Sequence, residues 1–102
     1  MRLWILLGVF VVSCGGTSPG PATHAHFQAI QRHEATLDEA RTPALEGECA
    51  EQCEAVSRGC RAAERICEIA EGTTDADAQL RCRAARERCA QYRAASESCA
   101  CR

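Results

Sequence analysis

The sequence predicts an all-α protein: an antiparallel helical hairpin stapled by disulfides, with a shorter N-terminal helix packed on it. Residues 46–71 are rich in Ala, Glu and Arg and contain no proline, which is typical of a helix. A second helix-forming stretch follows after a turn of a few residues, so the two helices must lie side by side and antiparallel. Nine cysteines in 102 residues indicate that covalent cross-links compensate for the small core of so short a chain.

The opening stretch "MRLWILLGVFVVSC" predicts where the protein resides. Arg2 precedes an uncharged run, residues 3–12, which is too short to span a bilayer but is typical of a signal peptide. The "VVSC" that follows resembles the lipobox of bacterial lipoproteins. This resemblance implies that residues 1–13 are a cleaved signal peptide, that Cys14 is lipidated, and that the mature chain lies in the cell envelope. Gly15 after Cys14, rather than Asp, implies the outer membrane rather than the inner one.

The next two segments connect this N-terminus to the hairpin. Residues 14–23 are the lipidated N-terminus and, because they are rich in Gly, Pro, Ser and Thr, a flexible tether. Residues 24–43 are an accessory helix with a thin apolar stripe of Phe27, Ile30 and Leu37, and Pro43 is expected to end it. The stripe is expected to pack on apolar residues of the hairpin that lie outside its cysteine face, namely Ile66, Ile69 and Leu80.

The hairpin domain is predicted to span residues 46–102. Gly72 stands where the first helix needs a C-terminal cap, and Thr74 with Asp77 resembles a capping box that opens the second helix. We expect that second helix to run from about residue 75 to residue 98. Glu68 and Arg81 face each other in this register and are a candidate ion pair between the helices.

The cysteine spacing predicts the cross-links. Steps of 4, 7 and 7 residues place four cysteines on one face of the first helix, and folding at the turn sets the remaining four opposite them. Partners whose position numbers add up to nearly the same value should pair, which gives Cys67–Cys82, Cys60–Cys89, Cys53–Cys99 and Cys49–Cys101. The alternative outer pairing, Cys49–Cys99 with Cys53–Cys101, fits the mirror register less well. Alanines such as Ala63 and Ala85 allow the close approach that a disulfide requires.

The sequence favours a lipid-anchored structural or interaction module and not an enzyme, and it calls for no cofactor. It contains no CxxC, no Gly-rich phosphate loop and no Ser/His/Asp signature. Its expected partners are the membrane, through the lipid on Cys14, and a protein of unknown identity. The net charge of −2 argues against nucleic acid as a partner.

Two alternative roles use the same residues differently. Reduced cysteines lining a helix could bind Cu(I), as in the bacterial copper-storage family, and the group His24, His26 and His33 could bind Cu(II) or Zn²⁺. Thiol exchange is the other alternative. The "CAC" of residues 99–101 is the least regular part of the cysteine set and the place where a labile bond is expected.

Overall fold

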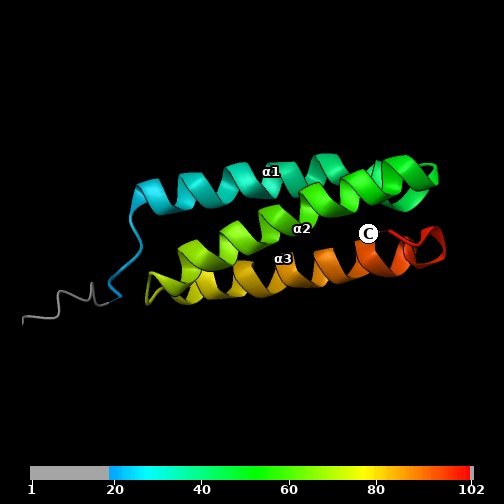
Figure 1. Ribbon diagram of the computed structural model, residues 1–102. Helices are drawn as coiled ribbons and strands as arrows, with labels where there is room; N and C mark the ends of the chain where they lie inside the picture. The colour runs from blue at the N-terminus through cyan, green and yellow to red at the C-terminus, as the bar shows by residue number, and fades with distance from the viewer. Residues whose placement is uncertain (1–18, 102) are drawn as a thin grey trace, which may run out of the picture.

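The computed structural model describes residues 19–101, which form three long helices and one short 3-10 turn (Figure 1). The helices are α1 (His24–Glu46), α2 (Cys49–Glu71) and α3 (Ala76–Ala95), and the turn η1 spans Glu97–Cys99. α2 runs obliquely between the other two helices and contacts both. The all-α prediction is confirmed, as is the stapled hairpin of α2 and α3 with α1 packed on it. The predicted signal peptide and Cys14 lie outside the described residues.

α1 is longer than the sequence predicted. It begins with a capping box, in which the Thr23 side chain accepts from the His26 backbone N–H and the His26 side chain accepts from the Thr23 backbone N–H. The expectation that Pro43 ends the helix is wrong, because the helix continues to Glu46. A proline in the last turn removes only one backbone hydrogen bond. The turn is held by Ala44, which is fully buried, and by the Gly47 N–H, which donates to the Pro43 carbonyl at 3.1 Å.

In the turn between α2 and α3, the predicted cap of α2 is confirmed and the predicted cap of α3 is wrong. Gly72 caps α2 as expected, but α3 is capped by Asp75, whose carboxylate accepts from the Ala78 N–H at 3.0 Å. The capping box of Thr74 and Asp77 is therefore wrong. Thr74 instead donates its backbone N–H to the Gly20 carbonyl at 2.8 Å. This bond pins the end of the predicted tether to the turn, so the tether is not free up to residue 23.

Four large side chains are fully buried among many small ones: Tyr92, Ile30, Leu37 and Ile66. The predicted contact between the α1 stripe and α2 is confirmed for Ile66, and Phe27 and Ile69 pack at the edge of the same core. Leu80 is 56% exposed, so its predicted contact with the stripe is wrong. One residue step turns a helix by about 100°. Because Arg81 faces α1, the preceding Leu80 points away from it.

Gly59, in the middle of α2, is packed against both of the other helices. A Cβ atom placed there would lie 3.0 Å from Cδ2 of Tyr92 and 3.6 Å from Cβ of Ala40. Glycine costs a helix interior about 1 kcal/mol relative to alanine. The absence of a side chain at this position leaves room for the Tyr92 ring, whose hydroxyl reaches the Leu37 carbonyl of α1, and this explains the glycine.

Candidate functional site

The two inner disulfides are those that the sequence predicted. Cys67–Cys82 and Cys60–Cys89 join α2 to α3 with Cα–Cα distances of 4.7 and 4.9 Å. All four of these cysteines are buried, and Ala63 and Ala85 are only 2% exposed beside them. Helix axes usually stand about 8–10 Å apart, so such short Cα–Cα distances need small residues between the rungs.

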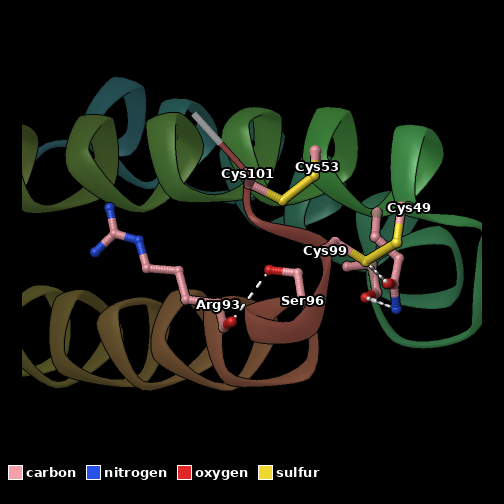
Figure 2. The surroundings of a disulfide bond; sticks show 8 residues. Cys49, Cys53, Arg93, Ser96, Cys99 and Cys101 are labelled. Atoms are coloured by element: carbon pink, nitrogen blue, oxygen red, sulfur yellow. Dashed lines mark hydrogen bonds between the residues drawn. A yellow bond between two sulfur atoms is a disulfide. The ribbon is translucent and has the colours of Figure 1, made fainter.

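The two outer disulfides are Cys49–Cys99 and Cys53–Cys101. The preferred prediction, Cys49–Cys101 with Cys53–Cys99, is wrong, and the alternative pairing is the one observed. Their Cα–Cα distances are 5.1 and 5.3 Å. Figure 2 shows the C-terminal segment crossing to α2, with Cys99 at the start of α2 and Cys101 opposite Cys53.

The outer pairing differs from the preferred prediction because the chain reverses direction after α3. The mirror register assumed a helix running to residue 98, but α3 ends at Ala95 and is followed by the 3-10 turn η1. Ala100 then adopts a left-handed conformation with φ 51° and ψ 50°. From Cys99 onward the chain therefore runs in the same direction as α2. The first cysteine of the tail, Cys99, meets the first cysteine of α2, Cys49, and Cys101 meets Cys53.

The left-handed residue between the two outer disulfides gives a testable prediction. Ala100→Gly is expected to increase the yield of the native outer pairing after oxidative refolding, and Ala100→Val is expected to decrease it. A left-handed conformation costs a residue with a Cβ about 1–2 kcal/mol, and a β-branched residue suffers most. Peptide mapping by mass spectrometry would measure the ratio of the two outer pairings, which should change by about fivefold. Equal ratios in all three proteins would show that the left-handed turn does not select the pairing.

Polar contacts between α3 and α1 were not predicted. Arg81 binds Glu34 through its Nε at 3.1 Å and through a second nitrogen, and its guanidinium lies 5.7 Å from the centre of the Phe27 ring. The predicted pair of Glu68 and Arg81 is therefore wrong, and Glu68 binds Arg65 of its own helix.

Two further contacts repeat this pattern along α3. Arg88 binds Asp38, and the Tyr92 hydroxyl donates to the Leu37 carbonyl at 2.7 Å. Arg81 and Arg88 lie seven residues apart and Glu34 and Asp38 four apart, so each pair lies on one helix face. This spacing was the signal in the sequence that could have identified α1 as their partner.

The hydrogen bond to Glu34 raises the pKa of the Arg81 guanidinium. A base with a raised pKa contributes its stabilisation below its ordinary pKa and loses it only as the pH rises through the raised value. Increasing the pH from about 7 to about 9 therefore leaves this ion pair intact.

The structure does not bring the three candidate histidines together. His26 uses its Nδ1 in the cap of α1, where it accepts from the Thr23 N–H at 3.0 Å. His33 lies seven residues further along α1, which is a rise of about 10 Å. His24 lies two residues before His26 and therefore on another side of the helix. Residues 19–101 contain no group of three or more His, Cys, Asp or Glu side chains placed to hold a metal ion.

Two shallow grooves run along the hairpin and are lined only by residues of α2, α3 and the tail. The first, about 500 Å³, has Glu64, Glu68 and Glu71 on the α2 side and Arg86 and Arg93 on the α3 side. The second, about 440 Å³, continues to the C-terminal end of the bundle. Its lining includes Cys53, Ser57, Arg93, Glu97 and Cys101. Disulfides thus form part of the wall of both grooves.

The oxidised cysteines indicate where the protein resides. Four disulfides point to an oxidising, extracytoplasmic location, because thiols are kept reduced in the cytoplasm. None of the helices between residues 19 and 101 has both the length and the apolarity of a membrane-spanning segment. No protein-family model matches the chain, and comparisons with curated proteins and with solved structures give no significant match.

Proposed function

We propose that the protein is an envelope lipoprotein, anchored through Cys14, whose stapled bundle is a structural or interaction module and not an enzyme. The observation that carries the proposal is the complete pairing of the other eight cysteines. Every cysteine between residues 49 and 101 thus already has a partner within that range. A cysteine that follows a short apolar run in "VVSC" and is not required for a disulfide fits lipidation.

The pin at the α2–α3 turn supports this proposal and defines how the bundle would face the membrane. The Gly20 carbonyl is bonded to the Thr74 N–H, and only five residues separate Gly20 from Cys14. Six extended residues reach at most about 20 Å. The turn end of the bundle would then lie near the lipid surface. The tail and the α1–α2 loop, at the other end of the bundle in Figure 1, would point away from it.

The surface of the bundle supports an interaction role. The first groove has one acidic wall and one basic wall, and both are built on a covalently held pair of helices. A partner would meet a rigid surface and would lose little conformational entropy on the side of this protein. Gly15 after Cys14, rather than Asp, favours the outer membrane over the inner one as the site of the anchor.

Removal of the lipidated thiol tests the anchor. Cys14→Ser is expected to move the protein from the membrane fraction to the soluble envelope fraction, because a serine cannot form the thioether that holds the diacylglyceryl group. Intact mass of the wild-type protein should correspond to a chain beginning at Cys14 and carrying lipid. Thr17→Ala, in the same segment, serves as the matched control and should remain in the membrane. The proposal is wrong if Cys14→Ser stays membrane-bound and the wild-type mass shows no lipid.

A further inference from the structure

The four disulfides fall into two classes according to their exposure. The cysteines of Cys60–Cys89 and Cys67–Cys82 are at most 8% exposed and lie in the core. Cys49 and Cys101 are exposed, and their partners Cys99 and Cys53 are half-buried. Because exchange requires an external thiolate to reach a sulfur atom, only the outer pairs are open to it.

The tail depends on these outer disulfides for its position. Its backbone hydrogen bonds are local: Cys99 donates to the Ser96 carbonyl and Ala100 donates to the Glu97 carbonyl. The Ser96 hydroxyl donates to the Arg93 carbonyl of the preceding turn (Figure 2). None of these backbone and hydroxyl bonds reaches α2, and the polar contact of the tail with α2 is that of the Cys99 Sγ with the Gln52 Oε1 at 2.9 Å. Cleavage of Cys53–Cys101 would thus change the end of the tail while Cys99 keeps this contact and its disulfide to Cys49.

Cys53–Cys101 is the exposed disulfide that also lines a groove with a cationic side chain. Both of its cysteines line the second groove, which is open to solvent and also contains Arg93. Figure 2 shows the Arg93 side chain extending from α3 towards α2, with its guanidinium turned away from the Cys53–Cys101 disulfide. When the disulfide opens, the exposed Arg93 side chain is the cation of this groove that can swing towards the thiolate and make it a better leaving group. Glu97, in the same groove, is the acidic group that opposes this effect.

We propose that Cys53–Cys101 is a thiol-exchange site for an external dithiol, and that the inner disulfides only hold the fold. A thiolate of the dithiol attacks the Cys101 Sγ and forms a mixed disulfide. The Cys53–Cys101 bond breaks, and its electron pair leaves on the Cys53 Sγ, which is then a thiolate in the groove with Arg93. The second thiol of the dithiol attacks the mixed disulfide and releases Cys101. The dithiol becomes a disulfide, and its two protons and two electrons convert the cystine into two thiols.

Stepwise reduction with dithiothreitol would test the order of cleavage. The full-length protein in detergent would be quenched with acid at intervals, alkylated and mapped by mass spectrometry. Cys53–Cys101 is expected to open at least about tenfold faster than either inner disulfide, with the helical circular dichroism signal unchanged. Loss of all four disulfides together, or earlier cleavage of Cys49–Cys99 or an inner pair, would overturn the proposal. The exchange requires only the folded bundle, so its outcome does not depend on whether Cys14 carries lipid.

A charge variant would separate exposure from the contribution of the groove. Arg93→Gln is expected to slow the opening of Cys53–Cys101 by about threefold at low ionic strength, and the difference should shrink in high salt. Arg83→Gln is the matched control, because Arg83 is also exposed on α3 but does not line the groove. Its rate should equal that of the wild type. Equal rates for both variants would show that Arg93 has no part in the exchange.

Discussion

Replacing Cys60 and Cys89 together by alanine is expected to lower the free energy of unfolding by about 3 kcal/mol. This disulfide joins the middle of α2 to α3 at a sequence separation of 29. The intact Cys67–Cys82 disulfide already closes the inner 15 of these, so the additional loop is about 14 residues. Thermal unfolding followed by circular dichroism should show a midpoint lower by about 15 °C. Using both replacements avoids a free thiol that could exchange with the other disulfides.

The matched control is the double replacement of Cys53 and Cys101 by alanine. With Cys49–Cys99 intact, this disulfide closes an additional loop of only about six residues, which corresponds to about 2 kcal/mol or less. The control should therefore unfold at a higher temperature than the inner variant. If the control lost as much stability as the inner variant, the attachment of the tail would be as important to the fold as the inner disulfides.

Gly59→Leu is expected to lower the free energy of unfolding by about 3 kcal/mol, because overpacking displaces the three helices from one another. The Cβ atom alone would lie 3.0 and 3.1 Å from two atoms of the Tyr92 ring. That ring cannot yield easily, since its hydroxyl is bonded to the Leu37 carbonyl. For Gly59→Ala we expect a loss of about 1 kcal/mol, because the helix propensity of alanine offsets part of the clash. Denaturant unfolding of each variant would measure these losses.

Ala84→Leu is the control for Gly59→Leu. Ala84 is exposed on α3, so the added side chain extends into solvent and should change stability by less than about 0.5 kcal/mol. A stable Gly59→Leu variant would mean that α1 and α3 do not approach α2 as closely as the described contacts require.

The inner half of the disulfide ladder was predictable because it depends on local regularity. A turn signal and two helices of fixed pitch determine which positions face each other, so Cys67 meets Cys82 and Cys60 meets Cys89. The outer half depends on where α3 ends. The sequence of residues 96–101 does not show that Ala100, which carries a Cβ, adopts a left-handed conformation. The end of α3 at Ala95, the turn η1 and this left-handed residue together bring Cys99 rather than Cys101 to Cys49.

The packing of α1 was predictable only in outline. Its apolar stripe indicated that it would cover the hairpin, and the burial of Ile30 and Leu37 confirms this. Its exact position was not predicted, because the thin stripe does not fix its register on α2, and the matching spacing of Arg81 and Arg88 with Glu34 and Asp38 was the signal that was not used. Gly59 leaves room for the Tyr92 ring between the helices, and Arg81 and Arg88 bind two of the acidic residues of α1, Glu34 and Asp38. The exposure of Leu80 follows from the same geometry.

The sequence by itself determined the helical class, the turn at Gly72, the two inner disulfides and an oxidised, extracytoplasmic chain. The helical class and the inner disulfides follow from composition and helix periodicity, the turn from Gly72, and the location from the N-terminal signal pattern, and each of these signals spans only a short stretch of sequence. The tertiary structure alone decided the pairing of the outer cysteines, the position of α1 on the hairpin and the hydrogen bond of Gly20 to the α2–α3 turn. These depend on contacts between residues about 50 positions apart, where shape and hydrogen-bond geometry select one arrangement among several that the same pattern of residues allows.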